Sequence, residues 1–87
     1  MGACIVTCPR KGCGKSFKLH KRKVTGVRRG TVVAMRLEKS RFFVSMMCKH
    51  CNAPIMNVLR IKDMRKLGYG DSVLRVVLSS GKLVGKR

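Results

Sequence analysis

Acidic residues are almost missing from this chain, which has three of them against 21 lysines and arginines. The formal net charge is therefore +18 over 87 residues, far more than solubility requires. Self-repulsion of this size destabilises a compact chain, so a partner of opposite charge is expected. The three acids are widely spaced and too few for a magnesium-dependent catalytic site. We therefore expect a protein that binds a polyanion, RNA or DNA before any other, and that is not an enzyme.

Aromatic residues are also scarce, because the chain has no tryptophan, one tyrosine and three phenylalanines. Its core must come mainly from valine, leucine, isoleucine and methionine, which bury less area per residue. The hydrophobic fraction of 45% is still high enough for collapse into a single domain over residues 1–87. A thin core in so short a chain usually needs a covalent or metal staple.

Long apolar runs are missing as well, and no segment approaches the roughly 20 residues needed to span a bilayer. The N-terminus has neither the charged segment nor the apolar segment of a secretory signal. We therefore expect no membrane partner and an intracellular location, either cytoplasmic, on the ribosome, or nuclear. These compartments are reducing, so clustered cysteines there indicate metal ligands before disulfides.

Four of the five cysteines form two closely spaced pairs. The first pair encloses Pro-Arg-Lys-Gly and the second encloses Lys-His. Each spacing suits a tight turn whose backbone N–H groups point at the sulfurs, and two such turns supply the four ligands of a tetrahedral zinc ion. Gly12, Gly14 and Asn52 would allow the positive φ values that such turns use. We predict one structural Zn2+ held by Cys8, Cys13, Cys48 and Cys51.

Residues 8–17, Cys-Pro-Arg-Lys-Gly-Cys-Gly-Lys-Ser-Phe, resemble the first half of a Cys2His2 zinc finger. The paired histidines of that family do not follow, and Gly26 and Gly30 stand where its recognition helix would lie. A metal ion bound by the first cysteine turn must therefore take its other two ligands from the second turn. The whole then resembles a zinc ribbon, in which two cysteine turns sit at one end of a small antiparallel sheet. Zinc ribbons occur in basic ribosomal proteins and in subunits of the transcription machinery, so the resemblance implies a role on nucleic acid.

Three further residues could compete for the metal. Cys4 has no partner at a suitable spacing, and we interpret it as a small buried apolar residue, with a role as replacement ligand as the alternative. His20 stands alone, and the ring of His50, inside the second turn, is expected to face solvent or a phosphate. The two-residue spacing of the second pair also occurs in redox proteins, but no clear helix is expected there whose N-terminus would lower a thiol pKa.

Most of the chain has the pattern of short strands. Residues 31–37, 42–47, 55–61 and 73–78 are rich in β-branched or alternating apolar residues and are predicted as four strands. The first two would form a hairpin through a turn at 38–41. Residues 62–67 are predicted as a short helix stopped by Gly68, and residues 18–30 as hairpin arms or an inserted loop. The expected fold class is small all-β, a zinc-ribbon-like antiparallel sheet with at most one short helix.

The first 30 residues carry nine basic side chains and no acid. We therefore divide the domain into a basic N-terminal arm region over 9–30, the sheet, and a short basic C-terminal tail over 82–87. Phosphate contacts from such an arm give affinity without reading sequence, and few aromatics are available to stack on bases. The residues predicted to contact nucleic acid are Arg10, Lys11, Lys15, Lys18, Lys21, Arg22, Lys23, Arg28 and Arg29.

Together these features predict a structural zinc protein that rests on RNA, with ribosomal RNA and neighbouring proteins of a larger assembly as its partners. The alternative is a zinc-ribbon regulator, transcription-associated or viral, that binds nucleic acid. A partner-binding surface formed by Ile55, Val58, Leu59 and Ile61 would favour the alternative.

Overall fold

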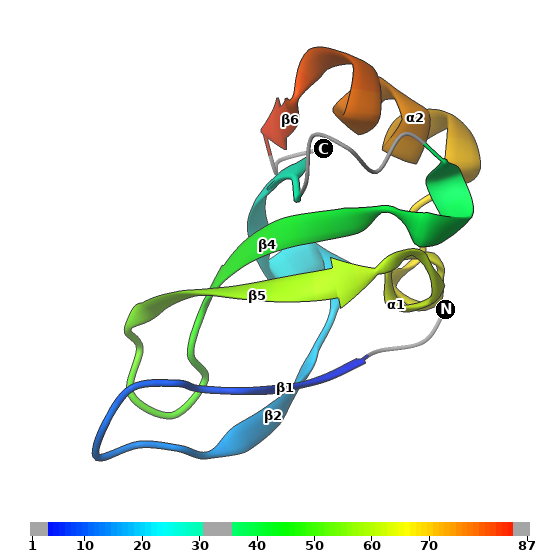
Figure 1. Cartoon of the computed structure of the whole chain (residues 1–87). Coiled ribbons are helices and arrows are strands. Elements are labelled where there is room, and N and C mark those ends of the chain that lie inside the picture. The colour runs from blue at the N-terminus through cyan, green and yellow to red at the C-terminus, as the bar shows by residue number, and fades with distance from the viewer. Residues whose placement is uncertain (1–3, 31–35, 85–87) are drawn as a thin grey trace.

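The computed structural model describes residues 4–30 and 36–84, which form two antiparallel sheets and two short α-helices (Figure 1). The smaller sheet pairs β1 (Cys4–Thr7) with β2 (Ser16–Leu19). The larger sheet has the strand order β5-β4-β3-β6. Its strands are β3 (Val24–Arg29), β4 (Arg41–Met47), β5 (Pro54–Arg60) and β6 (Lys82–Val84).

The helices connect and complete the larger sheet. Two 3-10 turns, η1 (Lys21–Lys23) and η2 (Leu37–Lys39), lead towards β3 and β4. The helices α1 (Ile61–Leu67) and α2 (Asp71–Ser80) follow β5 and carry the chain to the opposite edge, where β6 pairs with β3. Within the described residues neither α-helix has the length and apolar character needed to cross a bilayer.

The predicted class, a small all-β fold, is confirmed in that the chain is mainly β, but it has two short α-helices where at most one was expected. The strands predicted at 42–47 and 55–61 correspond to β4 and β5, which pair in register from Arg41 with Arg60 to Met47 with Pro54. The short helix predicted at 62–67 is α1, and it ends at Gly68, whose φ of 107° is the left-handed conformation that glycine adopts without strain.

The strand predicted at 73–78 is wrong, because this segment lies within α2. Valine-rich sequence favours strands, but here Leu74 and Val77 are spaced by three residues and are both fully buried. The helix contacts β3 and β6, and Asp71 in its first turn is favourably placed against the helix dipole. Burial on one helical face therefore outweighs the intrinsic strand preference of valine.

The predicted pairing of 31–37 with 42–47 is also wrong, because β3 and β5 occupy the two sides of β4. Residues 31–35 lie outside the described part of the chain, and Leu37 belongs to the 3-10 turn η2. The partner of β4 on that side is instead β3, where Val27 pairs with Val44. The segment 18–30 is thus no inserted loop: it contains the end of β2, the turn η1 and all of β3.

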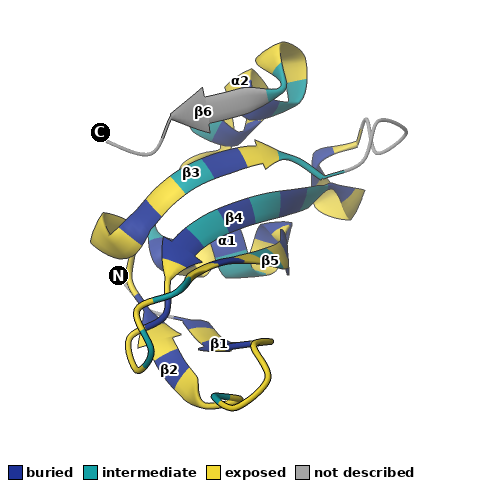
Figure 2. Ribbon diagram, turned by 90° about the vertical axis from the view of Figure 1, so that its left-hand side faces the viewer, coloured by how far each residue is buried: buried dark blue, intermediate teal, exposed yellow. Residues whose placement is uncertain are grey.

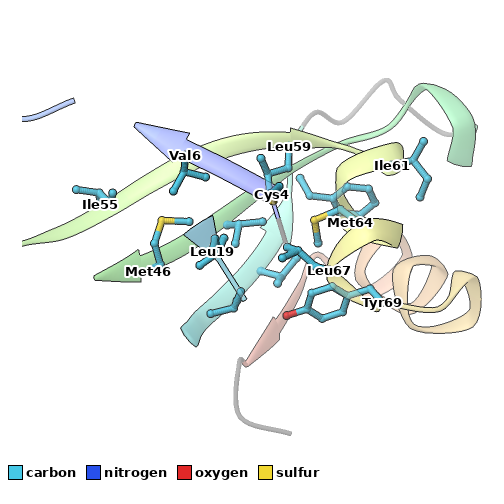
Figure 3. Packing of buried hydrophobic residues seen from close by; sticks show 14 of the residues in the cluster. Cys4, Val6, Leu19, Met46, Ile55, Leu59, Ile61, Met64, Leu67 and Tyr69 are labelled. Carbon is cyan, nitrogen blue, oxygen red and sulfur yellow. The ribbon is translucent and has the colours of Figure 1, made fainter. Parts of the chain in front are cut away.

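The larger sheet buries one of its two faces. Phe42, Val44 and Met46 of β4 are fully buried and alternate with half-buried or exposed neighbours, as Figure 2 shows along the strand. The buried side belongs to one apolar cluster to which β1, β2, α1 and α2 all contribute. Figure 3 shows Met46 and Leu19 in this cluster together with Met64 of α1. The fold is therefore a sheet with the small hairpin and both helices packed on a single face.

Candidate metal centre

Two hairpin turns bring four cysteines together. The turn between β1 and β2 carries Cys8 and Cys13, and the turn between β4 and β5 carries Cys48 and Cys51. Both turns lie at the end of the molecule remote from α1 in Figure 1. The four Sγ atoms all lie within 4.8 Å of one another. The grouping expected from the sequence is therefore present, and it could hold one metal ion.

The sulfur positions suit tetrahedral coordination. The Sγ atoms of Cys8 and Cys51 are 3.8 Å apart, and those of Cys13 and Cys48 are also 3.8 Å apart. Four sulfurs at about 2.3 Å from a central ion would be separated by about 3.8 Å along each edge of the tetrahedron. None of the five cysteines, all within the described residues, forms a disulfide. The donor set and the two Sγ–Sγ distances of 3.8 Å thus fit a thiolate-bound metal.

The local backbone explains why these turns can wrap an ion. Gly12 and Gly14 have φ values of 91° and 60°, and Asn52 has a φ of 59°. All three lie in the left-handed region predicted for them, which glycine and asparagine adopt most readily. Backbone bonds close each turn at its base: Cys8 N–H donates to the Lys15 carbonyl and Cys48 N–H donates to the Ala53 carbonyl.

Backbone N–H groups also polarise the sulfurs. The N–H of His50 lies 3.4 Å from the Sγ of Cys48. The N–H of Cys51, followed by that of His50, helps to lower the pKa of Cys48 to about 6, against the opposing effect of burial. These N–H groups therefore favour the thiolate form of Cys48, which is the form that binds metal.

Cys8 has the opposite tendency. The N–H of Arg10 lowers its pKa, but burial and the neighbouring thiols of Cys13, Cys48 and Cys51 outweigh this and raise the pKa to about 12. Thiolates this close together repel one another, so the second and later protons leave only with difficulty. A bound cation would remove that obstacle, because its charge stabilises all four thiolates at once.

The fifth cysteine is separate from this group. Cys4 on β1 is 6% exposed and lies in the apolar cluster beside α1 (Figure 3). Burial, then the charge of Asp63, raise the pKa of its thiol, while Lys66 opposes them. The interpretation of Cys4 as a small buried apolar residue is confirmed.

Neither histidine belongs to the cysteine group. His20 is exposed and directly precedes η1. The Nε2 atom of His50 lies 3.1 Å from the Ser16 carbonyl, and its ring meets the edge of Phe17 with 6.2 Å between centroids. His50 is exposed, as expected for a ring that faces solvent, and its side chain also joins the second cysteine turn to β2.

Replacing both histidines tests the ligand set directly. The variants His20→Ala and His50→Ala should each retain one metal ion per chain, because neither ring lies among the four sulfurs. His50→Ala should lose a little stability, since it removes the contact with β2. Plasma mass spectrometry of the purified variants measures the metal content, and a variant that purifies without metal would contradict the four-cysteine ligand set.

The basic residues predicted to contact nucleic acid lie on several elements. Arg10, Lys11 and Lys15 are exposed on the first cysteine turn, and Lys18 is exposed on β2. All three residues of η1 are exposed, and the Nζ atom of Lys21 lies 4.9 Å from the centre of the Tyr69 ring.

The two arginines of β3 differ in their surroundings. Arg28 is exposed, whereas Arg29 is half-buried and donates from Nη1 to the Leu78 carbonyl at 2.9 Å. Arg29 therefore ties β3 to the C-terminal end of α2. The positive charge that the two arginines share does not distinguish the exposed side chain of Arg28 from the structural one of Arg29.

Comparison of the chain with known protein families, with curated proteins and with solved structures finds no match.

Proposed function

We propose that this protein is a structural zinc protein that binds RNA through a basic surface, as a component of the ribosome or of another ribonucleoprotein particle. The observation that carries the proposal is the combination of a four-cysteine group with a net charge of +18. Zinc is the metal of choice, because tetrahedral sites with four sulfur ligands hold zinc or iron, and zinc requires no redox chemistry. The ion would supply folding energy that a small core lacks.

The distribution of charge supports a phosphate-binding surface. The turn η1 consists of three exposed basic residues, and the first cysteine turn adds Arg10, Lys11 and Lys15. Among the three acids, Asp71 is paired with Arg65 at 3.0 Å. Contacts from such side chains to phosphate release counterions and give affinity that does not depend on base sequence.

The aromatic residues support a protein that rests mainly on RNA backbone. Phe17, Phe42 and Tyr69 are all buried, so three of the four aromatic rings are used by the core. A protein that binds single strands autonomously would expose several rings for base stacking. We place this chain in a larger particle, in contact with ribosomal RNA and neighbouring proteins.

The partner-binding surface expected for the alternative function, a transcription-associated or viral regulator, is mostly buried. Ile55, Leu59 and Ile61 are buried in the apolar cluster, and only Val58 of that set is exposed. We also propose that the chain catalyses no reaction and works inside the cell, where thiols stay reduced and available to zinc.

Fractionation of cells that express the full chain tests the proposal. We expect the protein to sediment with ribosomal or other ribonucleoprotein particles in a sucrose gradient, to remain there at high salt, and to be released by ribonuclease. Elemental analysis of the purified chain should find one zinc ion. Sedimentation as a free protein at modest salt, together with preferential binding to DNA, would instead support the regulator.

A further inference from the structure

The larger sheet has a second face that no described element covers. Pairing of β4 with β3 and β5 places Phe43 between Arg28 and Val58, and Ser45 between Gly26 and Met56. The exposed fractions are 54% for Val58, 43% for Met56 and 42% for Met47. The hairpin and both helices contribute to the apolar cluster on the other side (Figure 2). We call this surface the open face: Gly26, Arg28, Arg41, Phe43, Ser45, Met47, Pro54, Met56, Val58 and Arg60.

The open face is basic at one end and carries no acid. Arg41 pairs with Arg60 across β4 and β5, and Arg28 lies opposite Phe43 on β3. None of the four strands contains an aspartate or glutamate. Arg41 already donates to the Lys39 carbonyl at 3.0 Å, whereas Arg28 and Arg60 are exposed at the surface. Arg28 on β3 and Arg60 on β5, the two strands that border β4, thus place positive charge on both sides of Phe43, and no acidic residue of the sheet neutralises it.

Phe43 is the one aromatic residue that the core does not bury, and it is half-buried in the middle of this face. Directly opposed side chains in an antiparallel sheet have Cβ atoms about 5 Å apart, so Arg28 and Val58 both adjoin the Phe43 ring. An aromatic ring on an open sheet face, with arginines beside it, is the arrangement on which unpaired RNA bases stack while their phosphates meet guanidinium groups. The apolar side chains Met56 and Val58 would extend the platform for a neighbouring base.

We infer that the open face binds unpaired nucleotides of the RNA, with one base stacked on Phe43 and the adjoining phosphates against Arg28 and Arg60. This inference rests on the proposed function and adds to it a site for single-stranded RNA, distinct from the backbone contacts of η1. The charge of the face selects this occupant over an apolar protein surface. A partner protein would leave Arg28 and Arg60 beside desolvated apolar groups without an acid on this sheet to pair with.

The test uses the full metal-loaded chain and fluorescence anisotropy. The probes are a short labelled RNA strand without self-complementarity and the duplex of that strand with its complement. Phe43→Leu keeps an apolar side chain but removes the ring, and it should weaken single-strand binding by about fivefold or more. Phe43→Tyr keeps an aromatic ring and should bind the single strand about as well as the wild type, whereas Arg28→Gln should weaken that binding. Arg75→Gln on α2 is the matched loss of one charge outside the face and should have a smaller effect than Arg28→Gln.

Three results would overturn the inference: unchanged single-strand binding by Phe43→Leu, an equal loss for strand and duplex, or failure of Phe43→Tyr to bind the single strand about as well as the wild type. Sedimentation of the RNA-free protein adds a fourth, since dimers that Phe43→Leu dissociates would make the face an interface between copies. Failure of the proposed function looks different, because the wild-type chain would then bind neither strand nor duplex. Metal content and amide spectra of each variant verify that it is folded.

Discussion

Replacing Cys48 by serine should leave the chain without metal and without a stable fold. Cys48 is 1% exposed, and its Sγ atom lies 3.8 Å from the Sγ atom of Cys13. The same sulfur accepts a hydrogen bond from the backbone N–H of His50. A serine hydroxyl does not ionise near neutral pH and cannot replace a thiolate. Structural zinc sites supply about 10–16 kcal/mol of apparent binding free energy, comparable with the whole stability of a small domain. The proton–nitrogen spectrum should therefore collapse to the narrow dispersion of an unfolded chain.

Cys4 provides the matched control for this experiment. Cys4→Ala also removes a buried thiol, but one that lies in the apolar cluster and outside the sulfur group. It should keep one metal ion and a dispersed spectrum, with a cavity cost of about 1 kcal/mol. A well-dispersed spectrum for Cys48→Ser, or metal loss from Cys4→Ala, would show that the metal and the fold are not coupled in this way.

Neutralising the three residues of η1 should produce the second large effect. Lys21, Arg22 and Lys23 are all exposed, and each phosphate contact contributes about 0.7–0.9 to the slope of log affinity against log salt. Changing all three to glutamine should lower that slope by about two and weaken RNA binding most strongly at low salt. Binding isotherms at several salt concentrations measure both quantities.

A control of equal charge separates local contacts from the general field of the protein. Glutamine at Lys62, Lys66 and Arg75 also removes three charges, but from exposed positions on α1 and α2. This variant should change the slope far less. Since Lys21 also lies over the Tyr69 ring, a thermal melt must show that the η1 variant remains folded. Equal slopes for the two variants would rule out η1 as a phosphate-binding element.

The cysteine group was predictable because ligand type and spacing are local properties. Two pairs of thiols at turn spacing, with glycine or asparagine beside them, restrict both the backbone and the coordination chemistry. The positive φ values of Gly12, Gly14 and Asn52 follow from the same local sequence. The role of His50 was not predictable, because its contacts with Ser16 and Phe17 join residues 33 or more positions apart.

The pairing of the strands and the helical conformation of α2 could not be predicted from the local sequence pattern. Val24–Arg29 contains a glycine and two arginines and has a weak strand signal of its own, yet it pairs with both β4 and β6. In α2 the four apolar residues Val73, Leu74, Val77 and Leu78 fit a helical face, but the three valines of the segment, at positions 73, 76 and 77, favour a strand. The packing surface available on β3 and β6 decides between these two conformations.

The open face also combines a feature that the sequence predicts with one that depends on how the strands pair. The alternation in residues 42–47 predicts that one side of this strand is buried, but it cannot say what covers the other side. That Phe43 has Arg28 and Val58 as neighbours depends on the register of three strands.

By itself the sequence determined the charge, the chemistry of the four thiols and the mainly β character of the chain, because each depends on residue type or on neighbours within a few positions. Only the tertiary structure decided which strands pair, which face of the sheet stays open and which basic residues remain at the surface. These depend on the free energy of burying apolar area against partners distant in sequence, and such partners exist only once the chain has folded.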